Sequence, residues 1–116
     1  MANRDCLFCG ILEGDIPADI VYESDTAIAF RDINPQAPTH VVIIPRKHIA
    51  TINDIDADDH AIVGSLYTAA STIAREEGFS EEGYRAVMNC NKAAGQTVFH
   101  IHLHLLGGRV LTWPPG

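Results

Sequence analysis

The segment at positions 98–106, VFHIHLHLL, alternates between two kinds of side chain along its whole length. Successive side chains of a β-strand point to opposite faces of a sheet, so a period of two predicts a strand here. One face would lie beneath a helix and carries Phe99, Ile101, Leu103 and Leu105. The other face carries Val98, His100, His102, His104 and Leu106. Neighbouring histidines would stand about 7 Å apart, which makes them a row on one face of the sheet.

The other extended segments predict an antiparallel sheet around this strand. Two short strands flank the turn at 23–25, and a third strand runs from His40 to Ile44. A fourth is expected in YRAVMNC at 84–90, followed by the small-residue loop NKAAGQT at 91–97. The predicted fold class is therefore α+β, an antiparallel sheet of about five strands with one long helix packed on it.

A single long helix is predicted between residues 56 and 78. Asp56 is a plausible N-cap, Asp58 and Asp59 suit the positive end of the helix, and Gly78 is a natural stop. Apolar residues recur at helical spacing between these ends, and this stripe would pack on the sheet. It consists of Ile62, Leu66, Ala69, Ala70 and Ile73.

Composition limits the kinds of partner that this chain can have. With 116 residues, 47% of them hydrophobic, we expect one compact domain over residues 1–116. A formal net charge of -7 argues against a nucleic-acid or membrane-surface partner. No apolar run approaches the roughly 20 residues of a membrane span, and the N-terminus is polar, so a cytoplasmic protein is expected. A phosphate ligand would need a site built from local donors.

Three imidazoles beside a small-residue loop suit phosphoryl chemistry. Imidazole is a good nucleophile when neutral and a good donor to phosphate oxygens when protonated, and its ordinary pKa of about 6.5 allows both. In the loop, Gly95 lets backbone N–H groups approach an anion, while Gln96 and Thr97 add donors. Two alternatives stay open here: a metal site made of all three histidines, or histidines that are only core or surface residues.

Several motifs resemble one known family. HIHLHLL fits the H-φ-H-φ-H-φ-φ signature of the histidine triad (HIT) superfamily, in which φ is an apolar residue. INPQAPTHVVIIPRKHI, GQTVFHIHLHLLGGR and the terminal WPPG resemble its Hint branch, the histidine triad nucleotide-binding proteins. The similarity runs over roughly residues 8–116. It implies a homodimer with a HIT-like fold, a site for a purine nucleotide (AMP or GMP), and hydrolysis of nucleoside 5'-monophosphoramidates.

The resemblance implies roles for the residues that match its motifs. His102 would be the nucleophile that forms a nucleotidyl-histidine, His104 would contact the phosphate, and His40 would support the nucleophile from the neighbouring strand. Thr97, with Gln96, would line the phosphate and leaving-group side. These roles are expectations carried over position by position.

The resemblance also implies a set of nucleotide contacts. They are Ile16, Phe30, Asp32, Ile33, Asn89, Gly95, Gln96, Thr97, His102, His104 and Trp113. Within this set Asp32 would accept hydrogen bonds from the ribose hydroxyls, and the three apolar side chains would form the slot for the base. Trp113, in the C-terminal tail, would reach toward the partner's active site. Without the resemblance, Asp32 could equally organise the turn that follows it, and the apolar three could equally be core.

Cys6 and Cys9 form a C-x-x-C pair near the N-terminus. The pair alone is a weak signal, because a structural zinc site needs four ligands. The resemblance implies the other two, His48 and His100, and hence a closed Cys2His2 zinc site that ties the N-terminal segment to the triad strand. On the residues alone, a redox pair and inert thiols stay open. No organic cofactor is expected.

Three other functions compete with phosphoramidate hydrolysis. The chain could hydrolyse dinucleoside polyphosphates or transfer nucleotidyl groups, it could be a nucleotide-binding regulatory dimer with vestigial catalysis, or it could be a purely structural zinc protein. A glutamine after the triad would favour the polyphosphate branch, but LLGGR stands there instead. The sequence leaves the leaving group and the choice between adenine and guanine open.

Overall fold

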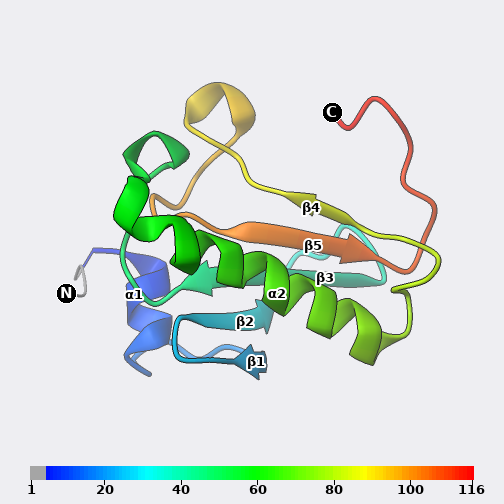
Figure 1. The fold of residues 1–116 in the computed structure, drawn as a ribbon, viewed down its shortest axis with the longest axis horizontal. Helices are drawn as coiled ribbons and strands as arrows, with labels where there is room; N and C mark the ends of the chain where they lie inside the picture. The colour runs from blue at the N-terminus through cyan, green and yellow to red at the C-terminus, as the bar shows by residue number, and fades with distance from the viewer. Residues whose placement is uncertain (1–4) are drawn as a thin grey trace.

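The computed structural model describes residues 5–116, which form one antiparallel five-stranded sheet with a long helix on one face (Figure 1). The helices and strands are α1 (Leu7–Leu12), β1 (Ile20–Glu23), β2 (Ala27–Arg31), β3 (Thr39–Pro45), α2 (His60–Glu77), β4 (Arg85–Val87) and β5 (Leu103–Gly107). The strand order is β1-β2-β3-β5-β4, and every neighbouring pair is antiparallel. The predicted α+β fold class is confirmed. No helix within residues 5–116 combines the length and apolar character needed to cross a membrane.

Both faces of the sheet are buried, which divides the core into two clusters. On the α2 face, Val41 and Ile43 of β3 pack with Leu66 of α2 and Leu103 of β5. On the opposite face, Phe8 and Ile11 of α1 cover alternate residues of β2 and β3, namely Ile28, Phe30, Val42 and Ile44. Because the side chains of one strand alternate between the two clusters, β2 and β3 read as continuous apolar runs in the sequence.

The register of β3 and β5 decides where the histidines of these strands meet. His40 lies opposite Leu106 and Val42 lies opposite His104, so His40 and His104 are diagonal neighbours on the same face. That face is the one opposite α2, because Val42 belongs to the α1 cluster. The pairing brings together two imidazoles that are 64 residues apart in the chain.

The long helix begins later than its expected cap. Asp56 caps a 3-10 turn, Ala57–Asp59, through a reciprocal capping box with Asp59, and α2 starts at His60. Gly78 ends the helix in the left-handed conformation, with φ of 89°. The predicted stripe is buried except at Ile62, which is half-buried near the first turn.

The expected strand over 98–106 is wrong in its first half. β5 begins only at Leu103, and the backbone N–H of Ile101 donates to the carbonyl of Ile49 instead of a neighbouring strand. Phe99 is 48% exposed, so it does not lie beneath α2 as expected. The strand expected over 84–90 is also shorter, since β4 covers Arg85–Val87. The alternation persists where it matters: Ile101, Leu103 and Leu105 pack under α2, and the histidines take the other side.

Candidate active site and metal-ligand cluster

An open pocket of about 740 Å³ lies on the face of the sheet opposite α2. Its walls come from α1, the ends of β2 and β5, and the loop before β5. All the nucleotide contacts expected from the sequence line it except Gln96 and Trp113. Those that line it are Ile16, Phe30, Asp32, Ile33, Asn89, Gly95, Thr97, His102 and His104. The fold therefore gathers in one place residues scattered over most of the chain.

The contribution of α1 to this pocket was not expected from the sequence. Phe8 and Ile11 line it from that helix, beside Val42 of β3. The ring of Phe8 lies edge-on to His102, with the ring centroids 5.0 Å apart. The only hint in the sequence was that apolar residues surround the C-x-x-C pair, which does not say where the short helix docks.

His102 is held in one tautomer by the main chain. Its Nδ1 lies 2.9 Å from the carbonyl oxygen of His100, so Nδ1 carries the proton and donates. Nε2 of the neutral ring is then left with a free lone pair. Burial lowers the pKa of His102, and the ring is only 7% exposed, so it is neutral at neutral pH. A neutral imidazole with a free Nε2 beside a pocket is the form of histidine that acts as a nucleophile.

His40 and His104 form a second, directional pair. The backbone N–H of Gln36 donates to Nδ1 of His40 at 3.0 Å, so the proton of the neutral His40 ring sits on Nε2. That atom lies 2.9 Å from Nδ1 of His104 and donates to it. His104 therefore carries its own proton on Nε2, where it is available as a donor.

Burial keeps this pair neutral as well. It lowers the pKa of His104 to about 4, with the neighbouring His102 and His40 adding to the effect and Asp32 opposing it. Burial also lowers the pKa of His40. The carboxylate of Asp32, whose Oδ2 lies 3.4 Å from His40 Nε2, acts in the opposite direction and raises this pKa. Rings that stay neutral keep fixed tautomers and hence fixed donors and acceptors.

The sequence predicted that His40 supports His102, and the structure directs its hydrogen bond to His104 instead. His102 is held by the carbonyl of His100. The reason is register, because His40 lies diagonally opposite His104 while His102 lies beyond the paired part of β5.

Asp32 organises the turn that follows it and also lines the pocket. Its Oδ1 accepts the backbone N–H of Asn34 at 2.8 Å, which organises the turn, and the residue also lines the pocket. Arg31 lines the pocket too, but Glu77 binds its guanidinium through two hydrogen bonds of 3.2 Å each. An anion in this pocket would therefore depend on imidazole and backbone donors and on the side chains of Asn89 and Thr97.

Gln96 supports the loop instead of facing the pocket. Its Oε1 accepts the N–H of Asn91 at 2.8 Å, and its Nε2 donates to the carbonyls of Ala50 and Val98 at 2.9 and 3.1 Å. The residue is 5% exposed, so the amide has no donor left for a ligand. Gln96 therefore shapes the loop that presents Gly95 and Thr97.

Cys6, Cys9, His48 and His100 form a compact cluster whose ligand atoms all lie within 4.8 Å of one another. Nδ1 of His100 lies 3.4 Å from Cys6 Sγ and 3.2 Å from Nδ1 of His48, which lies 3.3 Å from Cys9 Sγ. A tetrahedron with bonds of 2.0–2.3 Å has edges of about 3.3–3.8 Å, so these spacings fit a metal ion. Nε2 of His100 donates to the carbonyl of Pro45 at 2.8 Å, which directs the lone pair of Nδ1 at the cluster.

Asp32, His40 and His104 also lie close enough to hold a metal ion, but their hydrogen bonds do not fit one. A metal-bound histidine normally donates its other ring N–H to an acceptor. Nδ1 of His40 instead accepts the N–H of Gln36, which leaves the proton on the atom that would have to bind the metal. This group is therefore a hydrogen-bonded chain.

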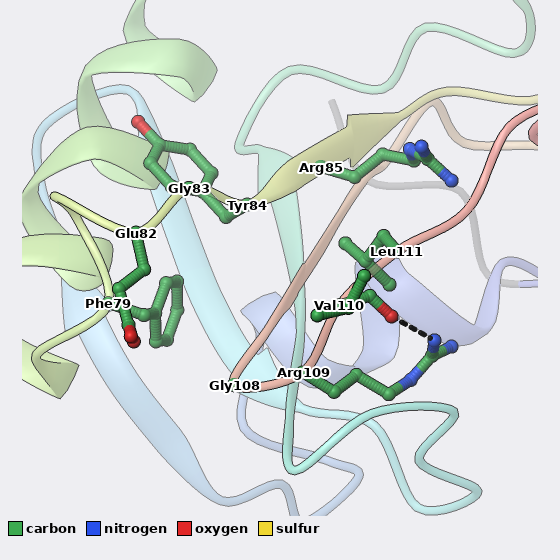
Figure 2. Close-up of a pocket in the computed structure, with 9 residues that line it drawn as sticks. All are labelled: Phe79, Glu82, Gly83, Tyr84, Arg85, Gly108, Arg109, Val110 and Leu111. Atoms are coloured by element: carbon green, nitrogen blue, oxygen red, sulfur yellow. Dashed lines mark hydrogen bonds between the residues drawn. The ribbon is translucent and has the colours of Figure 1, made fainter.

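Trp113 lies apart from the main pocket of its own chain. It is 80% exposed, and the guanidinium of Arg85 sits 5.8 Å from its ring centroid. A second pocket of about 450 Å³ lies between the segment that precedes β4 and the segment that follows β5. Arg85 and Arg109 are among its lining residues (Figure 2). None of the triad histidines lines this second pocket.

Comparisons with known proteins agree with this geometry. The family model described as HIT domain matches residues 13–111. The chain is 51% identical over 108 residues to the purine nucleoside phosphoramidase of Escherichia coli, covering 93% of this chain and 91% of that protein. The crystal structure of a HIT family hydrolase from Legionella pneumophila matches with a TM-score of 0.94 and 58% identity, over 97% of this chain and 100% of that one. A zinc-bound histidine triad family protein from Mycobacterium smegmatis matches with a TM-score of 0.78 and 36% identity, over 90% and 76% of the two chains.

Proposed function

Because this chain belongs to the HIT domain family, we propose that it is a purine nucleoside phosphoramidase, which hydrolyses the P–N bond of nucleoside 5'-monophosphoramidates. The resemblance first drawn from the triad and its flanking motifs is thereby confirmed at the level of the family. The proposal depends on one observation above all: the carbonyl of His100 holds the Nδ1 proton of His102, which frees Nε2 beside the pocket.

In the first step, Nε2 of His102 attacks the α-phosphorus in line with the leaving nitrogen. The P–N bond to the amine breaks with its electron pair on nitrogen, which takes up a proton from solvent and leaves as the free amine. The ring of His102 keeps its Nδ1 proton, and the carbonyl of His100 stabilises the positive charge that develops there. The product of this step is a nucleotidyl-histidine.

In the second step, water attacks the same phosphorus and the bond to His102 Nε2 breaks, returning the electron pair to the ring. The water releases one proton to solvent, so the two steps together consume one water and yield a nucleoside monophosphate and an amine. His104 contributes its Nε2–H to a phosphate oxygen in both steps, in the tautomer that His40 fixes. The N–H groups around Gly95 supply the further donors.

The nucleoside would occupy the other end of the same pocket. Ile16, Phe30 and Ile33 offer apolar surface for a purine, and Asp32, whose Oδ2 lies 3.4 Å from Nε2 of His40, would accept hydrogen bonds from the ribose hydroxyls. The side chain of Ile33 is fully exposed, so a base bound in the pocket could cover it.

The decisive experiment traps the covalent intermediate. The protein is mixed with adenosine 5'-monophosphoramidate, quenched early, and examined by intact mass and peptide mapping for an adenylyl group on His102. His102→Ala should lose nearly all turnover and still bind AMP, while His60→Ala, which changes an exposed histidine at the start of α2, should behave as wild type. Turnover retained in His102→Ala would refute the mechanism. Hydrolysis of a dinucleoside polyphosphate faster than that of the phosphoramidate would instead identify the chain as a polyphosphate hydrolase.

The cysteine–histidine cluster is proposed to hold a structural zinc ion. Two thiolates and two imidazoles satisfy the tetrahedral preference of zinc and leave no position for substrate, so the ion would stabilise the fold and do no chemistry. Its effect would be to fix α1 and the segment before His102 relative to each other. Metal analysis of untagged protein should give one zinc per chain, and less than about half an equivalent after purification with zinc present would contradict the site.

A homodimer is the assembly that we propose. β4 is an edge strand of only three residues, and exposed apolar side chains gather beside it, including Tyr84, Val110 and Trp113. In that assembly the tail would reach the partner's active site and influence which leaving group is accepted. Sedimentation should give twice the mass of the chain, and deletion of residues 113–116 should change the preference among amine leaving groups.

A further inference from the structure

The GGR triplet after the triad, Gly107 to Arg109, takes no direct part in the proposed mechanism. The structure explains its two glycines by close packing: a Cβ on Gly107 would collide with the ring of Phe79, and one on Gly108 would lie 2.9 Å from Cβ of Pro38. Gly108 also has a φ of 92°, which side-chain-bearing residues rarely adopt. These constraints bring the chain after β5 against the loop that precedes β3, and they place Arg109 beside that loop.

Arg109 donates two hydrogen bonds to one backbone carbonyl of this loop. Its Nε and Nη2 both donate to the carbonyl oxygen of Gln36, at 3.2 and 3.0 Å. Its Nη1 donates to the carbonyl of Val110 at 3.1 Å, which steadies the guanidinium from its own chain (Figure 2). The side chain thus uses two donors to hold a loop 73 residues away in the sequence, and its third donor binds the neighbouring residue.

The residue that Arg109 holds is the one that sets the tautomer of His40. The N–H of Gln36 donates to Nδ1 of His40 at 3.0 Å, and Nε2 of His40 donates to Nδ1 of His104 at 2.9 Å. Four groups therefore form a hydrogen-bonded chain from the surface to the pocket: Arg109 holds the position of Gln36, and from the N–H of Gln36 inward each donor direction is determined by the one before it. Oδ2 of Asp32, 3.4 Å from His40 Nε2, is the competing acceptor for the same proton.

We propose that Arg109 is a positioning residue for the phosphoryl chemistry. By holding Gln36, it fixes the proton of His40 on Nε2 and directs it at His104, so that His104 presents its Nε2–H to the phosphate. This inference rests on the proposed function of the pocket. A loosened Gln36 would let His40 turn toward Asp32 or take the other tautomer, and His104 would then lose the hydrogen bond that keeps its proton on the pocket side.

The test compares Arg109→Gln and Arg109→Lys with Arg75→Gln. Arg75 is an exposed residue in the last turn of α2, so the control removes the same charge at a site away from both pockets. We expect Arg109→Gln to lower kcat about tenfold with KM for adenosine phosphoramidate nearly unchanged, and Arg109→Lys to recover part of the loss. The thermal midpoint should shift by no more than a few degrees, since the residue is exposed.

The readout specific to positioning is the state of the imidazoles. Two-bond nitrogen–proton spectra of the zinc-loaded, AMP-bound protein should show the Nε2–H tautomer of His40 and His104 in wild type and in Arg75→Gln, and a mixture in Arg109→Gln. Unchanged ring signals in Arg109→Gln would overturn the proposal, whether or not kcat falls. Changed signals with an unchanged kcat would overturn it too. A wild-type protein inactive on phosphoramidates would refute the proposed function, yet the ring signals would still decide whether Arg109 sets the tautomers.

Discussion

Acidification should weaken the fold through His104, and the size of the effect can be worked from its surroundings. An unfolded histidine takes up its proton near pH 6.5, whereas burial beside His102 and His40 lowers the pKa of His104 in the folded protein to about 4. Because the folded pKa lies below the unfolded one, this contribution to stability is fully present above pH 6.5 and is lost as the pH falls toward 4.

The interval between these two pKa values corresponds to about 3.4 kcal/mol as an upper bound. His104 lines an open pocket and is half-buried, so screening by water should reduce the effect to roughly 1–2 kcal/mol. Urea unfolding of zinc-loaded protein at about pH 7.5 and about pH 4.5 measures the loss in free energy of unfolding. The matched variant is His104→Asn, which lacks the titrating ring.

The comparison isolates His104 because acid release of zinc would affect both proteins alike. His104→Asn should lose roughly 1–2 kcal/mol less than wild type over this pH range. Equal losses in the two proteins would refute the reasoning, since they would mean that His104 has the same pKa folded and unfolded.

Four further results are expected. Cys9→Ser should abolish stoichiometric zinc binding and lower the thermal midpoint, as followed by metal analysis and calorimetry, and unchanged zinc content would count against the cluster. Gln96→Ala should lower kcat through loss of three hydrogen bonds in the loop, with AMP affinity in a titration reporting whether the pocket still forms. Leu66→Ala should cost about 2–5 kcal/mol in urea unfolding, because the side chain is fully buried under the sheet. Gly108→Ala should destabilise by about 1–2 kcal/mol through its positive φ and the contact with Pro38, and a neutral effect would contradict the close packing.

Several features of the fold followed from the sequence because their causes are local. The period of two in the last strand separated Leu103 and Leu105 from His104, since neighbouring side chains of a strand must take opposite faces. Gly78 ended the helix where a left-handed residue was required. Asp56 supplied a cap, although a short 3-10 turn stands between it and the helix.

The expectations for the start of the last strand and for Gln96 failed because contacts with other segments of the chain decide both. The period of two predicted that the last strand begins at residue 98. In the structure, the N–H of Ile101 donates to the carbonyl of Ile49, and the side chain of His100 belongs to the cysteine–histidine cluster. Gln96 was expected at the phosphate, and its hydrogen bonds to residues 50, 91 and 98 turn it into the loop instead. No pattern in the sequence reports such partners, because the spacing between them is unrelated to any helical or strand period.

The sequence by itself determined which side chains could do phosphoryl chemistry and that the alternation at the end of the chain would separate the histidines from the apolar side chains that pack under α2. Only the tertiary structure decided how those rings are oriented: the register of β3 against β5 pairs His40 with His104, and the docking of α1 places Phe8 against His102. The physical reason is that a strand's alternation is a property of consecutive residues. The tautomer of an imidazole is instead set by whichever donor or acceptor the folded chain brings to its nitrogen atoms.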